Sequence, residues 1–308
     1  MNRRVTAPLS IRFSNAVTYD MRKFVFRFGI ALALTASAAA QVTWAQCRPP
    51  ANSHEAKLLA FYGVPLVFSA DPIAIAPDRP RLSVSLEGAY VPTPSATLQH
   101  TETCYTGRVQ HTNLTSFFGR PRLAVSLPGG FGLEASYLPP IKVSDATPNL
   151  RSFALWYTYS LRDAVALTLR AHTTRGTVHG PITCPKGSLQ QSDPNGACYS
   201  NTPSDDEFRP NQSGGELLAS IAPWGRDARV QLNAGVGVNA LRPRFQVGFS
   251  DLSGGTDHTA IAVNLTRVTG LLGATVKLND RCHVATQGYT SFGDATTVRG
   301  LIGCALVR

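Results

Sequence analysis

Apolar residues occupy every second position in segment after segment beyond residue 80. In residues 164–174 (AVALTLRAHTT), for example, apolar side chains lie on one side and Thr168, Arg170 and His172 on the other. A period of two predicts β-strands with one apolar face, and no stretch shows a helical period of useful length. The alternating segments are 81–91, 120–127, 131–138, 150–161, 164–174, 214–223, 228–240, 259–278, 282–291 and 297–308. The sequence therefore predicts an all-β chain of about ten strands, with eight and twelve as alternatives.

The connections between these segments alternate between short and long. Tight turns rich in Gly, Asn and Asp are expected at 128–130, 162–163, 225–227 and 279–281, and long connections at 92–119, 139–149, 175–213 and 241–258. Only 292–295 is short where a long connection is expected. This alternation places the tight turns together at one end of an antiparallel, up-and-down array, as in transmembrane β-barrels.

The composition of the strand faces favours a barrel in a membrane. The segment 150–161 has a continuous aromatic and aliphatic face, and the inner face of 228–239 is small and polar, which suits a narrow lumen. Aromatic residues near strand ends, expected in interfacial girdles, are Tyr90, Tyr137, Tyr159, Trp224, Phe245, Phe249 and Phe292. The alternative is a secreted soluble β-sandwich, in which the apolar faces would pack against each other.

The N-terminus has the pattern of an export signal. Basic residues at 22–27 precede the apolar run FGIALALTASAAA, and small residues offer cleavage after Ala40 or Ala45. Either Met1 or Met21 is the start. We expect a signal peptide at 1–45, an N-terminal periplasmic or plug segment at 46–80, and a barrel domain at 81–308.

The charge balance argues against a nucleic-acid partner. Residues 1–45 hold six basic residues and one acidic residue, so their removal lowers the net charge from +10 to +5. The remaining arginines are scattered singly through the strands and form no basic block. Zinc spacings, phosphate loops and nucleotide signatures do not occur, so we expect neither a metal nor another cofactor.

Over residues 81–308 the chain resembles bacterial outer-membrane β-barrel proteins. The resemblance implies an exported protein of the outer membrane that contacts lipid and is inserted by the barrel assembly machinery, with small solutes as a further partner. The most decisive observation is whether the first and last strands pair to close the sheet.

Charged residues on the polar faces are the candidate lumen residues. They are Glu134, Arg170, Arg229, Arg267 and Arg299. The expected function is a structural or interaction role, or the narrow passage of small solutes. One alternative is a hydrolase at the barrel rim, for which His172, Asp257 and His258 are weak candidates without a recognisable motif. The other alternative is a binding role for the soluble β-sandwich.

The six cysteines of an exported chain can form disulfides. Cys184 and Cys198 flank the turn sequence DPNG, so we predict that they pair. With a three-residue turn at 292–294, Cys282 lies opposite Cys304, which predicts a second bridge. Cys47 and Cys104 remain as an open third pair, since the topology puts them at opposite ends unless the N-terminal segment threads the lumen.

Overall fold

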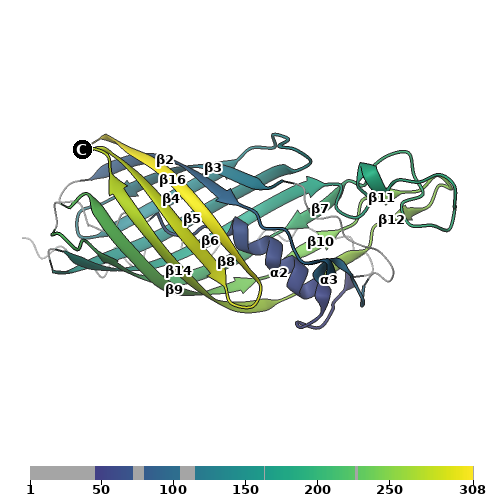
Figure 1. The fold of residues 1–308 in the computed structure, drawn as a ribbon, viewed down its shortest axis with the longest axis horizontal. Coiled ribbons are helices and arrows are strands. Elements are labelled where there is room, and N and C mark those ends of the chain that lie inside the picture. The colour runs from purple at the N-terminus through teal and green to yellow at the C-terminus, as the bar shows by residue number, and fades with distance from the viewer. Residues whose placement is uncertain (1–45, 72–79, 105–114, 163, 226–227, 308) are drawn as a thin grey trace, which may run out of the picture. The chain divides into compact units, whose positions relative to one another are not determined.

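Ten antiparallel strands form a closed barrel. The computed structural model describes residues 46–71, 80–104, 115–162, 164–225 and 228–307 (Figure 1); the predicted signal peptide lies outside these residues. The barrel strands are β2 (Arg81–Tyr90), β3 (Phe117–Ser126), β4 (Phe131–Leu138), β5 (Thr147–Arg162), β6 (Val165–Gly180), β8 (Gln212–Ile221), β9 (Val230–Leu241), β14 (Leu265–Lys277), β15 (Cys282–Ser291) and β16 (Ala295–Val307). The sheet closes because β16 pairs with β2 and β6 pairs with β8. The first and last barrel strands therefore pair, and the predicted antiparallel barrel is confirmed.

The connections divide the barrel ends as the sequence predicts. We call the end with the connections β3–β4, β5–β6, β8–β9 and β14–β15 the turn end, and the opposite end the loop end. At the loop end, β15 and β16 are joined by the short turn 292–294. Their register places Ser291 opposite Ala295 and Cys282 opposite Cys304.

The apolar strand faces point outward and are exposed. In the segment 164–174, Leu169 is 63% exposed, whereas its neighbour Arg170 on the other face is 2% exposed. Phe153 and Leu155 of β5 are likewise more than half exposed. Ser152, on the opposite face of the same strand, is buried. The sandwich alternative is therefore wrong, because these faces do not pack against one another. A closed barrel whose exterior is apolar is typical of a transmembrane β-barrel, because the outer face of such a barrel contacts lipid.

Aromatic side chains lie on this exterior near both ends. Tyr90 and Phe117 pack edge to face near the loop end, with ring centroids 5.9 Å apart. Phe131 and Tyr157 pack near the turn end at 4.8 Å. Of the seven predicted girdle residues, however, Phe245 and Phe249 are buried; these two were wrongly assigned to the membrane interface. They belong to a core above the barrel.

This second core lies in an extension of the sheet at the loop end. Beyond the barrel, β6 pairs with β7 (Asp206–Arg209), and the sheet continues through β10 (Arg244–Gln246), β13 (Ala260–Ala262) and β1 (Gln46–Cys47). A small separate sheet is formed by β11 (Phe249–Ser250) and β12 (Thr256–Asp257). The predicted long loops are thus partly ordered strands, too short to show a period. The remaining elements are α2 (His54–Leu66), α3 (Ala96–Gln99) and the 3-10 turn η1 (Lys186–Ser188).

Helix α2 lies where this extension meets the barrel (Figure 1). Ser53 caps its N-terminus by accepting a hydrogen bond from the Ala56 amide. Buried residues occur on nearly all sides of α2, consistent with its weak amphipathic pattern. In the part of the chain that the structure describes, no helix is long and apolar enough to span a membrane.

Three disulfides join the six cysteines. Two of them, Cys184–Cys198 and Cys282–Cys304, are the pairs predicted from the sequence. The third, Cys47–Cys104, joins the chain just before α2 to the connection between β2 and β3 at the loop end. This pairing is possible because the N-terminal segment enters the lumen from that end.

Candidate functional site in the barrel lumen

The chain fills its own barrel. Residues 64–71, which we call the lumen segment, comprise the end of α2 and the five residues that follow. Val64, Val67, Phe68 and Ser69 are each at most 2% exposed. At the far end of the segment, a carboxylate oxygen of Asp71 lies 3.4 Å from Nε2 of His283, which is near the turn end on β15. The segment therefore runs down the lumen from the loop end toward the turn end.

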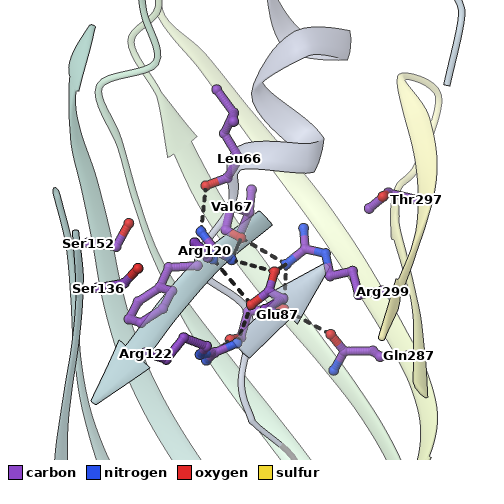
Figure 2. Close-up of polar contacts among 12 residues, drawn as sticks. Leu66, Val67, Glu87, Arg120, Arg122, Ser136, Ser152, Gln287, Thr297 and Arg299 are labelled. Carbon is purple, nitrogen blue, oxygen red and sulfur yellow. Dashed lines mark hydrogen bonds and ion pairs between the residues drawn. The ribbon is translucent and has the colours of Figure 1, made fainter. Parts of the chain in front are cut away.

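Seven charged side chains surround the lumen segment. This lumen network consists of Glu87, Arg120, Arg122, Glu134, Arg170, Glu216 and Arg299, all at most 4% exposed. They come from six barrel strands, at positions whose side chains point inward, as Figure 2 shows for four of them. Four cations and three anions give the network one excess positive charge.

Ion pairs link the network members into one chain of contacts. Glu87 lies 2.8 Å from Arg120 and also contacts Arg122 (Figure 2). Glu134 bridges Arg122 at 2.5 Å and Arg170 at 3.1 Å. Arg170 continues to Glu216, also at 3.1 Å. Each buried charge thus has an oppositely charged neighbour, which burial in a low-dielectric site requires.

The arginines of the network also bind the backbone of the lumen segment. Arg299 and Arg120 both donate to the carbonyl oxygen of Val67, each at 2.8 Å (Figure 2). Arg299 also donates to the carbonyl oxygen of Val64 at 2.9 Å. Carbonyl groups at the C-terminal end of α2 carry the negative end of the helix dipole, and that of Val64 also accepts the backbone N–H of Val67. The excess positive charge of the network therefore faces the end of the helix that stabilises it.

Phe68 is the centre of the site. Its ring is fully buried, and the guanidinium groups of Arg122, Arg120 and Arg170 lie 4.5, 4.8 and 5.0 Å from the ring centroid. These are cation–π distances, and such contacts are strongest in desolvated sites. Arg170 and His172 also hydrogen-bond to the Phe68 carbonyl oxygen.

The predicted lumen residues fall into two groups. Glu134, Arg170 and Arg299 belong to the lumen network. Arg267 also lies at an inward position of β14, but at the loop end, where it is partly exposed and pairs with Asp294 at 2.8 Å. Arg229 precedes β9 at the turn end and is exposed. These two lie beyond the closed part of the lumen because they are located at the ends of their strands.

The hydrolase candidates are not brought together. His172 is buried in the lumen, where its ring nitrogens contact the Phe68 carbonyl and, at 3.0 Å, the Asn239 side chain. Asp257 belongs to β12 in the extension, where its carboxylate accepts hydrogen bonds from Thr259. His258 follows it in the chain. Among the described residues, no group of three or more His, Cys, Asp or Glu side chains is arranged to hold a metal ion.

Four members of the lumen network were missed in the sequence: Glu87, Arg120, Arg122 and Glu216. Their signal is charge at inward positions of alternating strands, most clearly in the run RPR at 120–122, where both arginines share one face. The role of Phe68 has no such signal, because residues 46–80 show no period.

Comparisons with solved structures return bacterial outer-membrane β-barrels. Ail, the attachment invasion locus protein of Yersinia pestis, is 10% identical with a TM-score of 0.31, over 74% of this chain and 97% of Ail. The KdgM porin is 10% identical with a TM-score of 0.31, over 73% of this chain and 99% of its own. The translocator domain of the autotransporter NalP from Neisseria meningitidis is 11% identical with a TM-score of 0.35, over 83% and 96%.

Sequence identities of 10–11% and TM-scores of 0.31–0.35 do not assign a function to this chain. No protein-family model matches the chain, and no curated protein does. The closed sheet with its apolar exterior agrees with the predicted class of outer-membrane β-barrel.

Proposed function

We propose that this protein is an outer-membrane barrel that is closed by its own lumen segment and acts through interactions at its loop end. The observation that carries the proposal is the position of Phe68, fully buried among three arginine side chains in the middle of the lumen. A solute crossing the barrel would have to displace this ring.

The contacts of the lumen segment oppose that displacement. Val64, Val67, Phe68 and Ser69 all give backbone oxygens to arginines of the network. Moving the segment would deprive those guanidinium groups of these acceptors, and a hydrogen bond to a charged group contributes roughly 1.5–3 kcal/mol. The closed arrangement is therefore the stable one.

The loop end is the place where an interaction would occur. It carries the sheet extension, with its own core and the Cys184–Cys198 disulfide. The alternative, a narrow passage for small solutes, requires the lumen segment to move. Membrane insertion by the barrel assembly machinery is part of the same proposal.

Conductance in planar bilayers separates these two functions. We expect the wild-type barrel to show no stable open-channel current. The variant Phe68→Ala, which removes the ring that fills the lumen, should raise the frequency of openings. Phe153→Ala is the matched control, since Phe153 faces lipid and is 55% exposed. Steady wild-type currents with single-channel steps would contradict a closed barrel and support solute passage.

A further inference from the structure

An apolar cavity lies beside α2 at the loop end of the barrel. Its volume is about 150 Å³. Its lining includes Leu59 and Tyr62 of α2, together with Leu150 of β5, Val178 of β6 and Phe208 of β7. The lining is almost wholly apolar. The proposed interactions at the loop end do not account for an internal space of this kind.

We propose that this cavity binds one neutral molecule of about the size of a single six-membered ring. An apolar cavity of about 150 Å³ in another protein stays dry and binds benzene, so the volume matches a ligand of this class. Binding would replace empty space with dispersion contacts and would remove apolar surface from water. This inference does not depend on whether the lumen conducts.

Aromatic side chains in the wall favour a ring-shaped ligand. Tyr62 and Phe208 face each other edge to face, with centroids 6.5 Å apart. Ring pairs in such geometry attract each other beyond their burial, and a bound ring could extend the cluster. Burial raises the pKa of Tyr62, as expected for a phenol in a dry environment.

Glu55 makes the cavity selective for neutral ligands. Its carboxylate is in the lining, and one oxygen, Oε1, accepts three backbone N–H groups of residues 102–104 at 2.6–3.0 Å. The other oxygen, Oε2, is buried and has no hydrogen-bond partner among the described residues. An anionic ligand would be repelled here, whereas a ligand hydroxyl could donate to Oε2. Phenol should therefore bind, and benzoate should not.

The test is equilibrium dialysis of radiolabelled phenol and benzoate against the full chain in phosphatidylcholine nanodiscs. We expect one saturable phenol site per protein and at least tenfold weaker uptake of benzoate. Val178→Phe on β6 and Ala146→Phe in the connection just before β5 place extra bulk in the cavity and should weaken phenol binding tenfold or more. Val236→Phe adds the same bulk as Val178→Phe on the lipid-facing side, where Val236 is 60% exposed, and should bind like wild type.

Two results would overturn the proposal: no saturable phenol uptake by wild type, or uptake by Val178→Phe equal to that of wild type. Equal binding of benzoate would overturn the role given to Glu55. If both cavity variants fail to fold, as judged by heat-modifiable gel mobility, the site is tested instead with wild-type crystals soaked in 4-iodophenol. An anomalous iodine peak in the cavity supports the site, and a peak elsewhere or none refutes it.

Discussion

Glu87 is the residue on which the lumen network most depends, because it contacts Arg120 and Arg122 and lies 3.8 Å from Arg299. The variant Glu87→Gln keeps the shape but removes the negative charge, which leaves the arginines with less compensation. We expect the free energy of unfolding to fall by roughly 3–5 kcal/mol, the usual cost of breaking a buried ion pair. Urea unfolding in lipid vesicles measures this loss.

The matched control is Glu102→Gln, since the Glu102 side chain is 68% exposed and pairs only with His54 among the described ion pairs. Exposed pairs contribute about 0–1 kcal/mol, so this variant should unfold close to wild type. Equal effects of the two substitutions would show that the ion pairs of Glu87 do not stabilise the fold.

Glu55 predicts a local dependence on pH. Desolvation raises its pKa, but the N–H groups of Cys104, Thr103 and Glu102 outweigh this, so the pKa lies below its ordinary value of 4.5. A lowered carboxyl pKa stabilises the fold above the unfolded value, and this contribution is lost as the pH falls through the folded pKa. The contact between α2 and residues 102–104 should therefore hold at neutral pH and weaken in acid.

Amide hydrogen exchange at residues 102–104, corrected for intrinsic rates, measures this contact. Protection should stay constant from pH 7 to about 4.5 and decline below. Glu55→Gln should lower protection at neutral pH about tenfold or more, since hydrogen bonds to a charged group contribute roughly 1.5–3 kcal/mol. Protection independent of both changes would mean that Glu55 does not hold this connection.

At the scale of elements, alternation predicted the barrel strands but not the extension. The bounds of β4 agree with the predicted 131–138, and those of β15 with 282–291, because each lies between clear turns. The predicted strand 259–278 is in fact β13 and β14, which belong to different parts of the sheet. Short strands such as β7 and β10 hold three or four residues, too few to show a period.

The Cys282–Cys304 disulfide should stabilise the last hairpin. It closes a loop of 22 residues, for which chain entropy predicts roughly 3 kcal/mol. The double variant Cys282→Ser, Cys304→Ser should keep the ladder between β15 and β16, and thus still fold, but should unfold at lower urea concentration. Cys184→Ser with Cys198→Ser is the control, since that bridge lies outside the barrel strands and its loss should leave the barrel transition in place.

At the scale of the molecule, the sequence predicts the strands that form the barrel wall but not the residues that fill the lumen. Binary patterning shows which face of each strand is apolar, and the alternation of short and long connections indicates an up-and-down array, whose closure the pairings of β16 with β2 and of β6 with β8 show. The patterning does not show what fills the interior, because that depends on backbone oxygens of an aperiodic segment. The inward charge of Arg170 was therefore predicted, but its partner Phe68 was not.

The Cys47–Cys104 disulfide gives this arrangement a mechanical consequence. The lumen segment is fastened at the loop end by the bridge, and at the turn end it continues into β2, itself part of the wall. A segment that is attached at both ends of the barrel can shift within the lumen. It cannot leave the barrel through either end while the disulfide is intact. Complete withdrawal of the lumen segment from the barrel would therefore require reduction of the Cys47–Cys104 bond.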